Sequence, residues 1–160
     1  MRENLKDKKC FRVGVISDTH GYLNPGIAGT FQGVDLIVHA GDIGKVDVLE
    51  KLRRIAPVHA VRGNMDHGDW ARKLPRTQIV EAGKVLLYLL HDLTRLDLVP
   101  STAGLHAVIS GHTHRARVQE RNGVLLLNPG SATFPRFDAS GSVALLRIEG
   151  INLEVRLVDL

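Results

Sequence analysis

Residues 107–114 read Ala-Val-Ile-Ser-Gly-His-Thr-His, an apolar run that leads directly into two histidines. The run is short and rich in apolar side chains, so it predicts a buried strand that ends near Gly111. Side chains two residues apart in an extended segment point the same way. We therefore expect His112 and His114 to face one region of space, where two imidazoles suit a divalent cation. Taken alone, the pattern His-x-His is more often part of a solvated loop. Whether it binds a metal ion therefore depends on which other side chains lie beside it.

Four further apolar runs end in the same manner. Residues 11–16, 36–39, 58–61 and 84–90 each predict a strand, and each is followed by side chains that bind metals. Ligands of α/β sheets gather at the carboxyl ends of strands. Seven oxygen and nitrogen donors are too many for one tetrahedral zinc ion and suit two metal ions that share a carboxylate. The full set of candidates is Asp18, His20, Asp42, Asn64, His91, His112 and His114.

The elements between these strands predict a mixed α/β (α+β) architecture. A helical stripe over 47–54 follows Asp47 as its expected cap, a short helix begins at Asn24-Pro25, and residues 69–77 look irregular. Strand–helix–strand units of this kind pair in parallel, whereas later hairpins pair antiparallel. We expect turns at Ala82-Gly83 and Asn122-Gly123, and a last hairpin formed by 142–148 and 153–157. The pattern predicts two mixed sheets packed face to face and flanked by a few helices.

Length and composition limit the class of protein. The chain has 160 residues, of which 44% are hydrophobic and 24% charged, which is typical of a globular protein. The simplest organisation is one domain over 1–160 with a polar lead-in at 1–9. No apolar run could span a bilayer, and residues 1–9 lack the apolar core of a secretory signal, so we expect no membrane partner.

Cysteine usage and charge add two expectations. Cys10 is the only cysteine, which excludes an internal disulfide and a multi-thiolate zinc site and fits a cytoplasmic location. The net charge of +4 comes from scattered basic residues, so the chain shows no strong sign of nucleic-acid binding. The short runs at 53–54 and 115–117 are interpreted as exposed helix and loop surface.

The order of the motifs is specific. D-x-H at 18–20, G-D at 41–42, G-N-x-D at 63–66, a lone histidine at 91 and G-H-x-H at 111–114 resemble the calcineurin-like metallophosphoesterase superfamily. The length, the N-P-G-S at 128–131 and Pro135-Arg136 resemble its small single-domain phosphodiesterase branch. The resemblance extends from about residue 11 to the C-terminus and implies a four-layer sandwich.

The resemblance also implies a role for each matching side chain. Asp18, His20 and His114 would hold one metal ion, Asn64, His91 and His112 would hold a second, and Asp42 would bridge them. The implied activity is that of a metal-dependent phosphoesterase, foremost a phosphodiesterase, in which a metal-bridging hydroxide attacks a small phosphate ester. The ligand set favours Mn, Fe, Co, Ni or Zn, with Mn²⁺ first.

Two positions depart from the family pattern. Met65 occupies the position where many larger relatives carry a histidine that protonates the leaving group. Either the enzyme prefers esters with good leaving groups, or His67 acts as the acid instead. Asp92 follows His91 where relatives often have glycine. It either orients the His91 ring or caps the next turn, and the cap is the better interpretation.

The sequence also allows a function other than catalysis. A non-catalytic protein-binding scaffold, resembling the retromer subunit of this fold, is the alternative function, and the complete set of ligands favours the enzyme over it. Exposed hairpin strands would allow a homodimer. His39 and His59 lie within strand runs and are interpreted as structural, and Asp66 as a turn residue. Arg62 and Arg136 are candidates for contacts with substrate phosphate.

Overall fold

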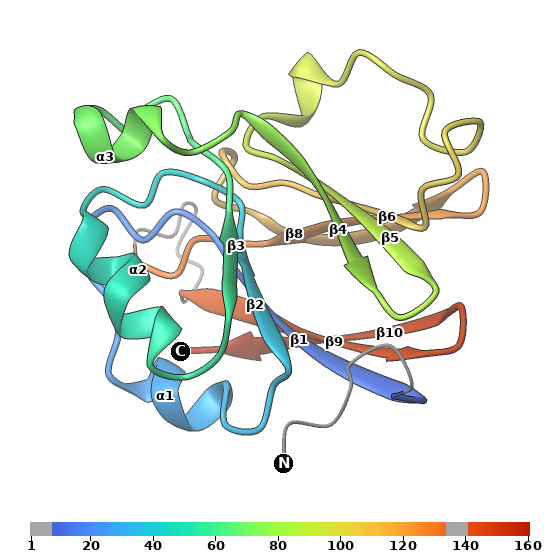
Figure 1. Cartoon of the computed structure of the whole chain (residues 1–160), viewed down its shortest axis with the longest axis horizontal. Helices are drawn as coiled ribbons and strands as arrows, with labels where there is room; N and C mark the ends of the chain where they lie inside the picture. The colour runs from blue at the N-terminus through green and yellow to red at the C-terminus, as the bar shows by residue number, and fades with distance from the viewer. Residues whose placement is uncertain (1–7, 134–140) are drawn as a thin grey trace.

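Two five-stranded β-sheets form the centre of the molecule, and the computed structural model describes residues 8–133 and 141–160 (Figure 1). The first sheet has the strand order β10-β9-β1-β2-β3, and the second sheet has the order β4-β5-β6-β8-β7. The strands are β1 (Cys10–Ile16), β2 (Leu36–His39), β3 (Val58–Ala60), β4 (Thr77–Ala82), β5 (Val85–Leu90), β6 (Ala107–Ile109), β7 (Ala116–Arg121), β8 (Val124–Pro129), β9 (Ser142–Glu149) and β10 (Asn152–Asp159). The helices are α1 (Gly26–Thr30), α2 (Val46–Arg53), α3 (Asp69–Arg72) and the 3-10 turn η2 (Leu93–Arg95).

Both sheets mix parallel and antiparallel pairs. In the first sheet β1 pairs in parallel with β2, and β2 with β3, because α1 and α2 carry the chain back between these strands. In the second sheet β6 pairs in parallel with both β5 and β8. Hairpins add the antiparallel strands β10, β4 and β7 at the edges. The predicted fold class, two mixed sheets packed together with flanking helices, is confirmed.

The main hydrophobic core lies between the sheets. Alternate side chains such as Val13 and Val15 of β1 point inward and meet Leu87 of β5 and Ile109 of β6, all with no exposed surface. Strands covered on both faces are apolar along their whole length, which explains the continuous runs in the sequence. At about 25 cal/mol per Å² of buried apolar surface, this core supplies most of the favourable free energy of folding.

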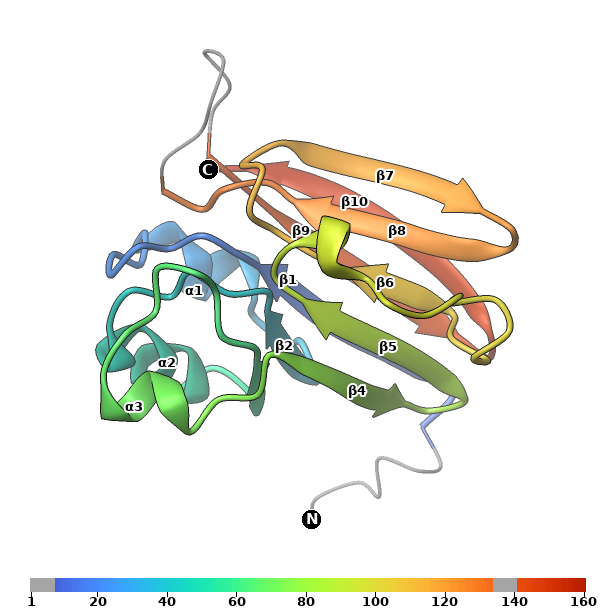
Figure 2. The ribbon, with the colours of Figure 1, turned by 90° about the horizontal axis from the view of Figure 1, so that it is seen from above.

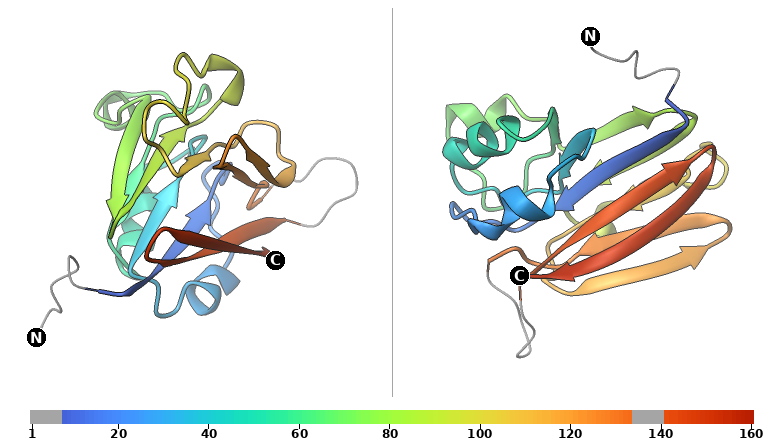
Figure 3. Two further views of the ribbon diagram at one scale, coloured as in Figure 1. Left: turned by 90° about the vertical axis from the view of Figure 1, so that its right-hand side faces the viewer. Right: turned by 90° about the horizontal axis from the view of Figure 1, so that it is seen from below.

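The two outer faces are covered differently. On the first sheet α1 and α2 pack over β1 and β2, where Ile27 and Leu49 contact Ile16 and Ile37, while β9 and β10 extend beyond the helices (Figure 3). On the second sheet the segment 92–105, with η2, crosses above β5 and β6 (Figure 2). This segment forms the fourth layer, and it leaves β7 uncovered.

Several local predictions need correction. The turn of the β4–β5 hairpin is Gly83-Lys84, because Ala82 pairs with Val85. Helix α2 begins after Lys45 without a side-chain cap, and Asp47 instead pairs with Lys51 at 2.8 Å.

Two further observations concern the remaining elements. Residues 69–72 are helical, not irregular. The hairpin at Asn122-Gly123 is confirmed, with both residues at positive φ. Within 8–133 and 141–160, no helix is long and apolar enough to cross a membrane.

Candidate metal centre

The carboxyl ends of five strands meet at one end of the sandwich. Figure 2 shows the arrowheads of β1, β5 and β6 pointing towards this end. The predicted candidates follow β1, β2 and β3 of the first sheet and β5 and β6 of the second. The sandwich therefore brings together side chains that are up to 96 residues apart in the sequence, from Asp18 to His114.

One group of three side chains surrounds the carboxylate of Asp18. Nε2 of His114 lies 3.2 Å from Oδ1 of Asp18, and Nε2 of His20 lies 3.3 Å from Nε2 of His114. Their donor atoms lie within 4.8 Å of one another, which is close enough to bind the same cation. Asp18 is completely buried, whereas the two histidines are partly exposed.

Asp42 stands between this group and the next. Its Oδ2 lies 3.9 Å from Nε2 of His20 and 3.3 Å from Nε2 of His91. Its Oδ1 accepts a hydrogen bond from the backbone N–H of Met65. One carboxylate oxygen is thus held by the backbone while the other faces histidines of both groups.

The remaining candidates form a second group. Nδ1 of His112 lies 3.1 Å from Oδ1 of Asn64, and the ring of His112 stands edge-on to the ring of His91, with centroids 5.1 Å apart. The rings of His20 and His114 form the other close pair, at 5.3 Å. The two histidines of the His-x-His motif therefore belong to different pairs, although they lie on the same loop.

Two buried polar atoms at the centre have no hydrogen-bond partner in the described part of the chain: Oδ1 of Asp18 and Nε2 of His91. Leaving such atoms unsatisfied is costly, so an ordered partner is expected there. His91 donates from Nδ1 to the carbonyl of Ala40 at 2.7 Å, which leaves the lone pair of Nε2 directed into the site. Carboxylate and neutral imidazole donors fit a divalent transition metal.

The backbone of the ligand loops is strained. Five of the seven candidates have positive φ, namely Asp18, His20, Asp42, His112 and His114. Residues other than glycine rarely adopt this region, and such strain concentrates at functional sites. Glycines allow the loops to approach closely. A Cβ on Gly63 would lie 2.2 Å from the backbone nitrogen of Asp42, and a Cβ on Gly111 would lie 1.9 Å from Oγ of Ser17.

Burial and neighbouring charges shift three pKa values at the centre. Burial penalises the charged form of Asp18 and raises the pKa of its carboxyl group, although the Ser17 hydroxyl opposes this. Burial also tends to raise the pKa of Asp42, but the adjacent His91 ring and the backbone N–H of Met65 outweigh this effect and lower the pKa. Burial lowers the pKa of His91, and contact with Asp42 more than reverses this shift. A nearby cation would stabilise the buried Asp18 carboxylate.

Asp66 supports the loop of Asn64, the alternative to the turn interpretation that its sequence position favours. It is buried, and its two carboxylate oxygens accept the backbone N–H groups of Gly44 and Gly63. It therefore ties the loop that carries Asp42 to the loop that carries Asn64. The Gly-Asn-x-Asp spacing was the available signal, because an aspartate three residues after a glycine can reach back to its N–H.

Asn128 holds the opposite side of the site. Its amide nitrogen donates to the carbonyl of Gly111 and to Oγ1 of Thr113, so it fixes the loop between the two histidines. Ser131 also reaches the site, where its hydroxyl donates to the backbone carbonyl of Asp18. Pro135 and Arg136 lie outside the described residues.

His39 is structural, as predicted. It is fully buried, its Nδ1 accepts the N–H of Gly41, and its Nε2 donates to Oγ1 of Thr19, which in turn donates to the carbonyl of Ile43. Burial lowers the pKa of His39 to about 3, so the ring is neutral. This chain of bonds joins the loops after β1 and β2. His59 bonds to Gln78 on the adjacent β4.

The structure does not bring His67 into the centre. Its side chain is exposed, and within 8–133 and 141–160 it has no recorded bond to any of the seven candidates. Asp92 caps η2, because its Oδ1 accepts from the N–H and hydroxyl of Thr94. Its Oδ2 also lies 3.9 Å from Nε2 of His112. Met65 is 56% exposed beside Asn64, at the mouth of the site.

Known proteins are similar to this chain in sequence and in fold. The sequence model of the calcineurin-like phosphoesterase superfamily domain matches residues 11–150. The chain belongs to this superfamily. A probable metallophosphoesterase of Methanothermobacter thermautotrophicus is 36% identical over 158 residues, and the match covers 91% of each chain. The family identified from the five motifs is therefore confirmed.

Solved structures with the same architecture include a phosphodiesterase and a Vps29 protein. An archaeal phosphodiesterase superimposes with a TM-score of 0.77 and 23% identity over 94% of this chain and all of that one. Vps29 of Chaetomium thermophilum superimposes with a TM-score of 0.76 and 23% identity, over 92% and 97%. At these identities the likeness concerns the fold alone.

Proposed function

We propose that this phosphoesterase is a metal-dependent phosphodiesterase with a dinuclear centre built from the seven strand-end residues. The observation that carries the proposal is the pair of unsatisfied buried atoms, Oδ1 of Asp18 and Nε2 of His91. Asp18 shares one potential metal-binding group with His20 and His114 and a second with Asp42 and His91. Asp18, His20 and His114 would hold one ion, Asn64, His91 and His112 the other, and Asp42 would bridge them. Mn²⁺ is the first candidate metal, and Fe, Co, Ni and Zn fit the same donors.

Bound divalent ions supply Lewis-acid chemistry: they activate water, orient the ester and neutralise charge on the phosphoryl group. The chain's own residues prepare the site for this. Asp18 and Asp42 bring negative charge, and hydrogen bonds fix one oxygen of each. Ala40 holds the His91 ring through Nδ1. Asn64 lies exposed at the mouth, where its amide can also contact a substrate oxygen.

The reaction replaces one ester bond. Oxygen from water forms a bond to phosphorus, the bond from phosphorus to the leaving oxygen breaks, and the leaving oxygen takes up a proton. Met65 cannot donate that proton, and His67 is exposed and forms no hydrogen bond to the seven candidates within the described part of the chain. The first of the two alternatives, a preference for esters with good leaving groups, follows from this arrangement.

The direct test is hydrolysis of bis-p-nitrophenyl phosphate by chelator-stripped protein, with single metal ions added back. We expect no activity without metal and restored activity with Mn²⁺. The monoester p-nitrophenyl phosphate serves as the comparison substrate and should react more slowly. Absence of activity with every metal would overturn the proposal and favour the scaffold alternative, which the likeness to Vps29 keeps open.

The same proposal includes three secondary expectations. The whole chain acts as one catalytic domain, it works in the cytoplasm as its single cysteine suggests, and small phosphate esters are its substrates. The uncovered strand β7 is the edge through which a homodimer would form. Analytical ultracentrifugation tests the last point, since a monomer at micromolar concentration would contradict it.

A further inference from the structure

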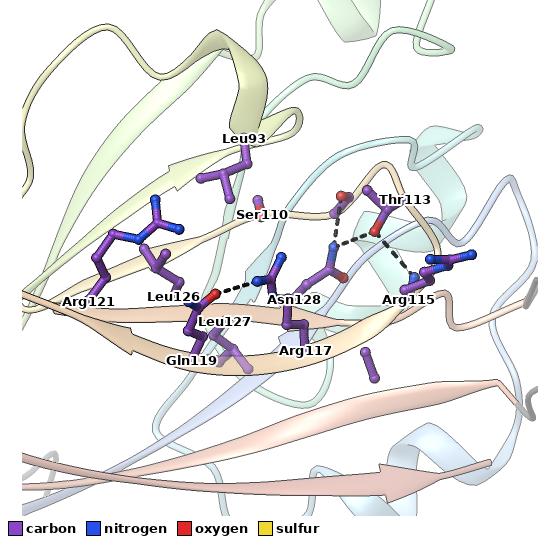
Figure 4. Close-up of a pocket in the computed structure, with 12 residues that line it drawn as sticks. Leu93, Ser110, Thr113, Arg115, Arg117, Gln119, Arg121, Leu126, Leu127 and Asn128 are labelled. Atoms are coloured by element: carbon purple, nitrogen blue, oxygen red, sulfur yellow. Dashed lines mark hydrogen bonds between the residues drawn. The ribbon is translucent and has the colours of Figure 1, made fainter.

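A groove of about 440 Å³ lies on the outer face of the second sheet, where the covering segment stops short of β7. Figure 4 shows Leu93 of η2 above the groove and Leu126 of β8 in its floor. The exposed strand β7 forms the far wall. We call this hollow, lined by Arg115, Arg117 and Arg121, the arginine groove.

One end of the arginine groove adjoins a loop of the candidate metal centre, although none of the seven candidate ligands lines the groove. Ser110, Gly111 and Thr113 line its end, and they belong to the loop that carries His112 and His114. Leu93 follows His91 by two residues on the opposite wall. A substituent that extends from a phosphate ester at the metal ligands past Thr113 would therefore reach this groove.

The groove is basic because of strand alternation. Arg117, Gln119 and Arg121 are every second residue of β7, so their side chains lie on one face, about 6.8 Å apart per step. Arg115 continues this row next to Thr113. Arg117 donates to Oε1 of Gln119, as Figure 4 shows. Within 8–133 and 141–160, no acidic residue lines the groove and no carboxylate lies within ion-pair distance of Arg121.

The sequence did not reveal this row. From the sequence, residues 115–117 are interpreted as exposed loop surface, whereas β7 begins at Ala116 and includes Arg117. Only a strand that begins at Ala116 places Arg117 and Arg121 on the same face.

We propose that the arginine groove binds the substituent of the diester that stays on the phosphate, and that this substituent carries at least one further phosphate group. The inference rests on the proposed phosphodiesterase function. Guanidinium groups match phosphate oxygens in a planar, two-pronged geometry. Among the described residues, the apolar side chains that line the groove include Leu93 and Leu126, and none is an aromatic residue on which a base could stack. Recognition therefore acts on phosphate charge and not on the identity of a base.

The test uses two matched pairs of chromogenic diesters in the metal-loaded enzyme. One pair is the p-nitrophenyl ester of thymidine 5′-phosphate with and without a phosphate on the 3′ oxygen. The other is the p-nitrophenyl phosphate diester of an alkanediol with and without a terminal phosphate. The added phosphate should raise kcat/KM about tenfold at low salt, mainly through KM, and the gain should shrink as salt rises.

The double variant R117A/R121A should bring the ratio of kcat/KM within each pair close to one. The matched control R156A removes an exposed arginine from β10 on the other sheet and should keep the wild-type ratio. A higher kcat/KM in the thymidine pair alone would show that the groove binds a nucleotide substituent. A higher kcat/KM in both pairs would show that it binds any substituent that carries a phosphate.

A second measurement does not depend on catalysis. In NMR spectra of the Zn²⁺-loaded protein, thymidine 3′,5′-bisphosphate should shift the resonances of Arg117, Gln119 and Arg121. Equal kcat/KM within both pairs, in an enzyme that hydrolyses bis-p-nitrophenyl phosphate, would overturn the groove proposal alone. The arginines of β7 would then have no part in substrate binding. Failure to hydrolyse bis-p-nitrophenyl phosphate with any metal would instead overturn the proposed function.

Discussion

Nε2 of His91 lies 3.3 Å from Oδ2 of Asp42, although the two residues follow strands of different sheets. The contact joins the sheets at the point where all seven candidate ligands meet. It also places Nε2 of His91 against the one carboxylate oxygen of Asp42 that faces both groups of histidines. The geometry of this pair leads to the first prediction.

His91→Ala should remove one of two bound ions and leave the fold intact. The ring supplies one of the two unsatisfied buried atoms, so its loss takes a donor from the second group. Loss of a residue that merely orients a ligand costs about 10–100-fold, so loss of a ligand should lower kcat/KM by at least about 100-fold. Metal content after dialysis and circular dichroism measure the two effects. His59→Ala, a half-buried histidine away from the site, is the control.

His112→Ala should leave one metal ion bound, because His112 pairs with His91 and Asn64 while His114 pairs with His20. His114→Ala should in turn leave the second group occupied. Titration calorimetry with Mn²⁺ counts the ions in each variant. If His112→Ala lost both ions at once, the division of the His-x-His motif between two ions would be wrong.

His39 predicts a pH dependence of stability. Its pKa is about 3 in the folded protein and near 6.5 when exposed, so between these values only the unfolded chain takes up the proton. The contribution of neutral His39 to the free energy of unfolding is therefore fully present above pH 6.5 and is lost as the pH falls towards 3. Between pH 7 and pH 5 the loss is about 2 kcal/mol of unfolding free energy.

Urea unfolding of wild-type protein and His39→Gln at both pH values isolates this effect, with chelator present to keep metal binding out of the comparison. The variant is less stable at pH 7, but its stability should change less between the two pH values. An equal change in both proteins would show that His39 is not kept neutral by the fold.

Met65→His should speed the hydrolysis of diesters with poor leaving groups. Met65 is exposed at the mouth beside Asn64 and cannot donate a proton, whereas a general acid is worth about 10²–10⁴-fold. The comparison is between the methyl and p-nitrophenyl esters of the same phosphate, and the gain should be confined to the methyl ester. His67→Ala is the companion variant and should leave both rates unchanged. A selective loss on the methyl ester would instead identify His67 as the acid.

The sequence was informative where chemistry follows directly from a strand end. Asp18 and His91 could be placed because an apolar run stops just before each, and ligands of α/β sheets gather at the carboxyl ends of strands. The left-handed conformations of Asp18 and His112 could not be predicted, since tertiary contacts impose them against local preference.

The roles of residues that support the site or line the groove could not be predicted from the sequence with the same ease. Asp66 reads as an ordinary turn residue until the loops after β2 and β3 are seen side by side, and Arg117 reads as surface until the start of β7 is known. Both misses come from contacts or boundaries between elements. Neither hydrophobic period nor motif spacing reports these features.

The central claim is that the seven residues hold two ions that work together. The most direct measurement titrates Mn²⁺ into chelator-stripped wild-type protein and follows bound metal and hydrolysis of bis-p-nitrophenyl phosphate in the same samples. We predict that binding saturates at two ions per chain and that activity follows the second ion. Saturation at one ion with full activity, or two bound ions with no activity, would contradict the account.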